Sequence, residues 1–245
     1  MKLNRIAGTT VRCAAVAALA VATFALAPSA LRAQVGHSPD HSPYEDLSTT
    51  MSLTAFGGEF HGHHDPAGVA PQSGAMYGVQ WDWRATGPLS LNADVASVAS
   101  TRHLINPAKA AKDRDLGTVS RPLYMANAGF AVALPGARTW HHLAPQLGMG
   151  AEVVSDLHSA PDSGGVKFGT RFAFTPEIGV RWLGSGRSRF GARLDFTDHL
   201  YSIGYPITLY QNAVNDPVLD ASVTRTQWIN NPALTFGISY LFGGR

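Results

Sequence analysis

The sequence predicts an all-β protein: an eight-stranded, antiparallel, up-and-down transmembrane β-barrel, preceded by a cleavable signal peptide. Three observations lead to this prediction. The N-terminus has the composition of a secretory signal, an alternation of apolar and polar residues recurs eight times in the rest of the chain, and the connections between these stretches are short and long in turn. Alternation with a period of two is typical of strands that have one apolar and one polar face.

Residues 1–33 have the three parts of a secretory signal peptide. They begin with basic residues, continue in an Ala-rich apolar stretch from Cys13 to Ala27, and end in small residues up to Ala33, after which we expect cleavage. An N-terminal membrane anchor is the rival interpretation. The apolar stretch is shorter and less hydrophobic than the roughly 20 apolar residues that a membrane-spanning helix needs. The signal peptide is therefore favoured.

The basic character of the chain belongs to this segment. The 245 residues include 19 Lys and Arg against 17 Asp and Glu, a formal net charge of +2. Cleavage after Ala33 removes four basic residues and no acidic ones, which leaves 15 against 17 and a net charge of −2. The single cysteine, Cys13, is removed too, so the mature chain has neither a disulfide nor a thiolate metal site. The composition gives no reason to expect a nucleic-acid partner.

Eight stretches after residue 50 alternate between two faces. In the clearest, residues 75–84, apolar side chains occupy every second position from Tyr77 to Trp83, and Asp82 lies on the other face. The first stretch is less regular than the others. The expected strands are 51–60, 75–84, 89–95, 124–134, 143–153, 172–182, 190–196 and 234–242.

The connections indicate how these strands are joined. Those at 85–88, 135–140 and 184–187 are short and turn-like, whereas those at 61–73, 101–120, 155–166 and 200–225 are long and polar. Outer-membrane barrels have this arrangement, with short periplasmic turns and long external loops. We therefore expect a periplasmic N-terminal segment, 34–50, and a single barrel domain, 51–245.

The residues of the two faces indicate which face lies outside. A soluble barrel also alternates, but with its apolar face inward. Here the polar face combines small residues with charges of both signs, which suits the narrow lumen of an eight-stranded barrel. Its charged members are Asp82, Arg84, Asp94, Glu152, Arg171, Glu177, Arg181, Arg193 and Asp195. The apolar face is almost free of charge, and Trp83, Trp182, Tyr240 and Phe242 are expected to form an aromatic girdle near the short turns.

The C-terminal strand resembles the β-signal of bacterial outer-membrane proteins. Thr235, Gly237, Tyr240 and Phe242 hold the polar, glycine and aromatic places of that motif, although Gly243, Gly244 and Arg245 follow the aromatic residue that is usually terminal. The mature chain resembles small outer-membrane β-barrels, the group that includes OmpA-type transmembrane domains and OmpW-like proteins. The resemblance implies a place in the bacterial outer membrane and recognition of the last strand by the barrel assembly machinery. It supplies no functional motif.

The most conspicuous cluster of possible ligands is His61-Gly62-His63-His64-Asp65, in the first external loop. Imidazoles and a carboxylate this close are suitable ligands for Zn, Cu or Ni. A solvated polar loop explains the same residues and is favoured. His37 and His41 are expected on the other side of the membrane, where they are poor co-ligands.

The inward charges either pair and close the barrel or line a conducting path. Side chains usually fill a barrel of this size. A buried charge is costly unless it is paired and hydrogen-bonded. A closed, plug-like interior is therefore favoured over an open channel.

An enzyme is the rival functional class, because some eight-stranded outer-membrane barrels modify lipid A. The deacylases have a His-x-Ser element on one strand, and no His and Ser in this sequence have that spacing. Asp198, His199 and Ser202 provide the groups of an unrelated triad, but such residues are expected in loops by chance.

A third class is surface recognition through the loops at 101–120 and 200–225. The first of these loops and its end carry a group of cations that is also suited to lipopolysaccharide phosphates: Arg102, Lys109, Lys112, Arg114 and Arg121.

We conclude from the sequence that the protein is a non-enzymatic integral outer-membrane barrel, structural or binding through its surface loops. A narrow pore and a lipid A-modifying enzyme are the alternatives. No catalytic, cofactor-binding or metal-binding residue is assigned. The expected partners are outer-membrane lipid and lipopolysaccharide, with the assembly machinery during biogenesis, and we expect a monomer.

Overall fold

The computed structural model describes residues 42–47, 49–158, 160–184, 188–211 and 216–243. The predicted signal peptide, His37 and His41 lie outside these residues. No helix in the described ranges is long and apolar enough to cross a membrane.

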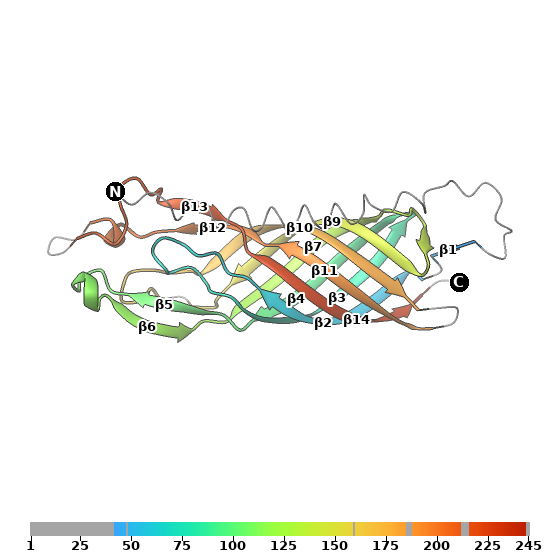
Figure 1. The fold of residues 1–245 in the computed structure, drawn as a ribbon, viewed down its shortest axis with the longest axis horizontal. Coiled ribbons are helices and arrows are strands. Elements are labelled where there is room, and N and C mark those ends of the chain that lie inside the picture. The colour runs from blue at the N-terminus through green and yellow to red at the C-terminus, as the bar shows by residue number, and fades with distance from the viewer. Residues whose placement is uncertain (1–41, 48, 159, 185–187, 212–215, 244–245) are drawn as a thin grey trace, which may run out of the picture. The chain divides into compact units, whose positions relative to one another are not determined.

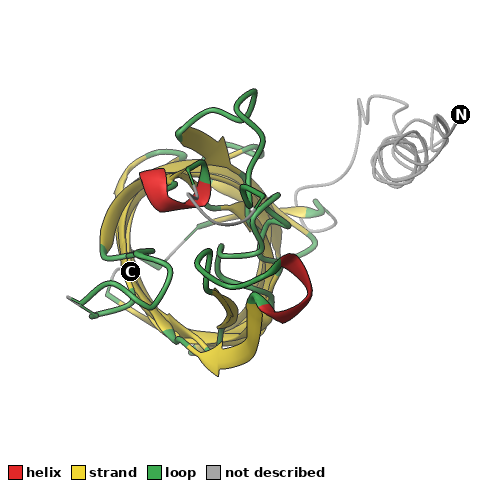
Figure 2. Cartoon of the chain, turned by 90° about the vertical axis from the view of Figure 1, so that its left-hand side faces the viewer, coloured by secondary structure: helices red, strands yellow, loops and turns green. Residues whose placement is uncertain are grey.

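Eight long antiparallel strands in the described residues form one closed barrel (Figures 1 and 2). They are β2 (Met51–Phe60), β3 (Gly74–Thr86), β4 (Leu89–Val98), β7 (Leu123–Ala133), β9 (Leu143–Ser155), β10 (Thr170–Leu183), β11 (Phe190–Asp198) and β14 (Pro232–Phe242). Each pairs with the next, and β14 pairs with β2 from Ala233↔Phe60 to Phe242↔Met51. The all-β class, the eight strands and the up-and-down order are confirmed.

The alternation seen in the sequence separates the inside of the barrel from the outside. On β3, Trp81 and Trp83 are 43% and 40% exposed, whereas Asp82 between them is 3% exposed. Apolar side chains on each of the eight strands point outward in the same way, among them Phe174 and Leu194. Monomeric soluble proteins rarely expose a continuous apolar area of this kind. The outer face therefore meets hydrocarbon, as in a membrane barrel and unlike a soluble one.

The short-turn end carries aromatic residues and the start of the described chain. Trp83, Trp182, Tyr240 and Phe242 are all exposed near this rim, as predicted. A further strand, β1 (Tyr44–Asp46), pairs with β8 (Arg138–Trp140) in the connection between β7 and β9, so this connection is more structured than predicted. Figure 1 shows β1 and the C-terminus at this end.

At the other end, two of the long connections continue the barrel hairpins. β5 (Thr101–Ile105) and β6 (Asp115–Ser120) pair from Thr101↔Ser120, which is the register of β4 and β7 carried past a break at residues 99–100 and 121–122. β12 (Leu200–Gly204) and β13 (Thr226–Ile229) extend β11 and β14 in the same way, from Tyr201↔Ile229. Short 3-10 helices lie in these two connections, Ala111–Asp113 and Ile207–Leu209.

The long polar connections at 101–120 and 200–225 therefore contain strands that the sequence did not predict. Each added strand has four to six residues with weak alternation. Such a strand is stabilised mainly by its place at the end of an existing ladder, which the local sequence does not reveal.

Leu194 lies near the middle of β11 and faces outward, so Leu194→Arg places a charge near the centre of the bilayer. We expect it to lower the free energy of unfolding in lipid vesicles by about 2–4 kcal/mol. Leu157→Arg is the matched control, because Leu157 is 71% exposed in an external connection. It should cost less than about 0.5 kcal/mol. Urea titration of folding into vesicles measures both, and equal effects would contradict the outward placement of β11.

Candidate functional site: the barrel lumen and its external mouth

A single arginine lies at the centre of the lumen. The Arg193 side chain, on β11, is 1% exposed and contacts three carboxylates. Its Nη1 donates to both oxygens of Asp82 at 3.2 Å, its Nη2 to Glu177 Oε1 at 3.2 Å, and its Nε to Asp195 Oδ2 at 2.5 Å. The guanidinium therefore joins β11 to β3 across the lumen and to the neighbouring β10.

Polar neighbours complete this group of charges. Arg181 on β10 lies directly opposite Arg193 in the strand register, and such like-charged pairs repel. Arg181 Nη2 donates to Ser52 Oγ at 3.0 Å, and Ser52 Oγ donates in turn to Asp82 at 3.0 Å. The amide of Gln146 donates to Glu177 at 3.0 Å. The cluster thus holds two cations and three carboxylates, and each of the three carboxylates accepts at least two hydrogen bonds.

A second polar group lies nearer the external end. His199, at the break between β11 and β12, lies 2.8 Å through its Nδ1 from Glu152 Oε2. Asn127 donates to Asp94 at 2.7 Å and accepts from Thr175 at 3.1 Å. Glu152 faces inward as predicted but does not contact Arg181 or Arg193. The register places Glu152 opposite Ala173, closer to the external end, where its partner is His199.

Apolar side chains fill the external part of the barrel above this group. Among them are Phe60, Leu123, Val154, Phe168, Tyr201 and Leu209, and most of these have no exposed surface. They come from barrel strands and from the external connections, so the connections fold into the mouth (Figure 2). This core is not evident from the sequence, because its members from the connections occur among polar residues without a regular period.

Polar cavities lie in the described lumen on either side of the Arg193 cluster. One opens toward the short turns and is lined by Asp82, Arg84 and Arg181 among others. The other lies between the Arg193 cluster and the apolar core and is lined by residues that include Asp94 and His199. The paired charges of the Arg193 cluster lie between these cavities.

Side-chain contacts hold the external connections together. Asp65 is buried, accepts from the backbone amides of Ala67 and Ala70, and also accepts from the Tyr205 hydroxyl at 3.2 Å. Arg114 on the second connection donates to the carbonyl oxygens of Asp216 and Pro217 on the fourth. The tips of two hairpins on opposite sides of the ring are thereby joined.

A single asparagine links the roots of two connections. Asn231 has no exposed surface. It donates from its side chain to the His199 carbonyl at 2.9 Å and accepts from the His63 amide at 2.9 Å.

The structure separates the side chains of both candidate sites, the histidine-rich loop at 61–65 and the group of Asp198, His199 and Ser202. In the histidine loop, the Asp65 carboxylate turns inward to its backbone and Tyr205 donors, while His61 and His64 are exposed. Among the described residues, no three His, Cys, Asp or Glu side chains are arranged to hold a metal ion. His199 contacts Glu152, whereas Asp198 accepts from the amide of Asn231. Asp198, His199 and Ser202 are thus not arranged as a triad.

Comparison with known proteins gives matches only among solved structures. No family model and no curated protein matches the chain. The crystal structure of Neisserial surface protein A is 14% identical with a TM-score of 0.41, and the match covers 82% of this chain and 98% of that one. The Yersinia pestis outer membrane protein Ail, in a bilayer nanodisc, is 10% identical with a TM-score of 0.36, covering 79% and 99%. The closed sheet, its apolar exterior and its charged interior are those of an integral outer-membrane β-barrel protein.

Arg193→Met leaves the three carboxylates with Arg181 as their only cation. We expect a loss of unfolding free energy on the order of 3–5 kcal/mol, because buried charges are then unpaired. Adding Asp195→Asn restores the net charge of the native cluster and should recover part of this loss. Arg225→Met, at an exposed arginine, is the control. Urea unfolding in vesicles measures the three variants, and a double variant no more stable than Arg193→Met would contradict the pairing.

Proposed function

We propose that the mature protein is a non-enzymatic outer-membrane barrel that serves as a rigid support for an external binding surface. The observation that carries this proposal is the closure of the lumen at two levels, by the Arg193 cluster and by the apolar core beneath the external connections. A barrel closed in this way supplies stability rather than a path for solutes. We therefore place partner binding at the external end of the barrel.

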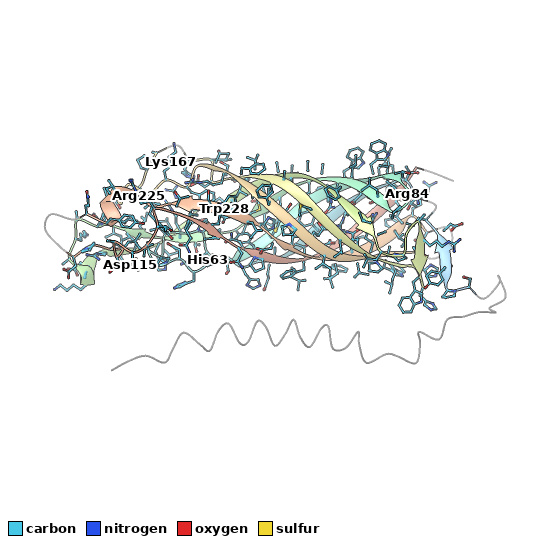
Figure 3. The ribbon with its side chains drawn as sticks, turned by 90° about the horizontal axis from the view of Figure 1, so that it is seen from above. His63, Arg84, Asp115, Lys167, Arg225 and Trp228 are labelled. Carbon is cyan, nitrogen blue, oxygen red and sulfur yellow. The ribbon has the colours of Figure 1, made fainter. Side chains whose placement is uncertain are left out.

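The external connections support the binding half of this proposal. Two of them continue barrel hairpins beyond the long strands, and contacts of Asp65, Arg114 and Asn231 hold them to one another. Figure 3 shows Asp115, Lys167 and Arg225 at this end and Arg84 at the other. Loops that a rigid scaffold positions are the usual place for recognition. We propose outer-membrane lipid and lipopolysaccharide as the surrounding partners of a monomer.

A narrow pore is the second candidate, and the two polar cavities favour it. A planar-bilayer measurement on the refolded protein distinguishes the two functions. We expect no steady conductance, because Arg193 and the apolar core interrupt the polar path. Protein-free bilayers with the same detergent are the control. Steady channels that Arg193→Met alters in conductance or ion selectivity would replace the proposed function by the pore.

The enzyme alternative is tested on the same preparation with lipid A as substrate. We expect no release of fatty acid from lipid A. Release that His199→Gln abolishes, with normal barrel formation, would make the protein a lipid A-modifying enzyme instead.

Recognition by the assembly machinery is a further part of the proposal. The aromatic rings of Tyr240 and Phe242 stack at 6.1 Å on the outer face of the last strand. Tyr240→Ala with Phe242→Ala should lower the amount of heat-modifiable barrel in the outer membrane and leave export to the periplasm intact, because the β-signal is lost. Phe130→Ala with Phe196→Ala, on the outer faces of β7 and β11, is the matched control. An unchanged yield of the first variant would argue against the β-signal.

A further inference from the structure

Three cationic side chains from different segments line one pocket in the external mouth. Arg102 comes from β5, Lys167 from the connection between β9 and β10, and Arg171 from the start of β10. No carboxylate lines this pocket in the described part of the chain. The remaining wall is largely apolar and includes Phe168 and Ile203. The pocket therefore combines positive charge with an apolar side.

Arg102 is the most buried of the three cations and is only partly neutralised. Its residue is 3% exposed, and its Nη2 lies 2.9 Å from Asp162 Oδ2. Its Nε and Nη1 have no hydrogen-bond partner among the described residues. Burial lowers the pKa of Arg102, and the nearby Arg121 lowers it further, while Asp162 and Asp156 offset only part of this effect. A guanidinium in such surroundings gains from another anion.

Arg171 is held at the pocket by its own connection. Its Nε donates to the Phe168 carbonyl at 2.9 Å and its Nη2 to the Lys167 carbonyl at 3.3 Å. The guanidinium carbon lies 5.9 Å from the centre of the Phe168 ring. These contacts involve backbone and ring atoms, so they orient the guanidinium without cancelling its charge.

Lys167 is exposed at the external end (Figure 3) and has no ion pair in the described structure. The acidic residues nearby already accept hydrogen bonds from other groups. Asp162 accepts from the backbone amides of Gly164 and Val166, and Asp156 accepts from that of His158. Asp65 accepts from two amides and a hydroxyl, as described above. With Arg121, the region has four cations against these three carboxylates.

We propose that this pocket binds a phosphate group, with Arg102 at its base and Arg171 and Lys167 at its entrance. Guanidinium groups match the geometry of phosphate oxygens, and lysine adds a mobile point charge. The apolar wall would contact the part of the molecule that carries the phosphate. The group belongs either to a membrane glycolipid or to a soluble compound. This proposal deepens the binding role proposed above and rests on it.

Phosphate binding to the refolded mature protein tests the proposal, in a detergent without phosphate. Inorganic phosphate is titrated and followed by phosphorus NMR. We expect saturable binding that Lys167→Gln weakens by about three- to tenfold, since one charge-assisted contact is lost. Lys112→Gln is the matched control: it removes another exposed lysine at the same end of the molecule, outside the pocket. Its binding should equal that of the unchanged protein.

Two results would overturn the pocket. One is no saturable binding by a protein whose heat-modifiable mobility shows a folded barrel. The other is equal weakening by Lys167→Gln and Lys112→Gln, which indicates diffuse attraction to surface charge. Neither result affects the conductance test, so failure of the pocket and failure of the proposed function are distinguishable. Phosphate binding by Arg102→Lys is a second test of the pocket. This variant keeps the positive charge but loses the planar guanidinium, so weaker phosphate binding is expected.

The source of the phosphate group is distinguished in nanodiscs. The titration is repeated in discs of phosphatidylcholine alone and in discs that also contain diphosphoryl lipid A. If inorganic phosphate no longer binds in discs that contain diphosphoryl lipid A, the glycolipid occupies the pocket. Unchanged binding in both kinds assigns it to a soluble phosphate compound. Both results require the pocket to bind phosphate, and Lys167→Gln should weaken the binding that remains.

Discussion

The buried guanidinium of Arg193 balances most of the charge inside the barrel. A closed sheet of eight strands leaves an interior that side chains nearly fill, and alternation sends the polar half of each strand into it. A charge in that space is costly unless it is paired and hydrogen-bonded. Arg193 meets this requirement with Asp82, Glu177 and Asp195, and Ser52 and Gln146 complete their hydrogen bonds. The pairing joins opposite walls of the barrel.

The filled interior is the reason for proposing that the protein binds its partners at the external end. The Arg193 cluster interrupts the polar path through the lumen, and the apolar core around Phe60 and Tyr201 occupies its external part. The lipid-facing surface is uniform and apolar. The surface with varied chemistry is therefore the external end, where hairpin extensions, exposed charges and the pocket around Arg102 lie together.

The external end keeps its shape because the barrel continues into it. β5 with β6 and β12 with β13 follow the register of the strands below them, and Asn231 ties two connections at the break. A binding pocket on connections of this kind loses less conformational entropy on binding than one on free loops. This preorganisation is the physical basis of the proposed phosphate site.

The eight strands and the face that meets lipid could be predicted from the sequence, because a period of two is a local property of each strand. The order of the strands followed from the alternation of short and long connections. The sequence also determined that Arg193 points inward. Only the tertiary structure decided that Asp82, 111 positions away, is one of its partners and that Glu152 pairs with His199 instead. The same holds for Arg102 with Asp162 and for the extended hairpins. Such contacts follow from the stagger of strands around the closed barrel and from the folding of connections into its mouth, and no local pattern of residues encodes either.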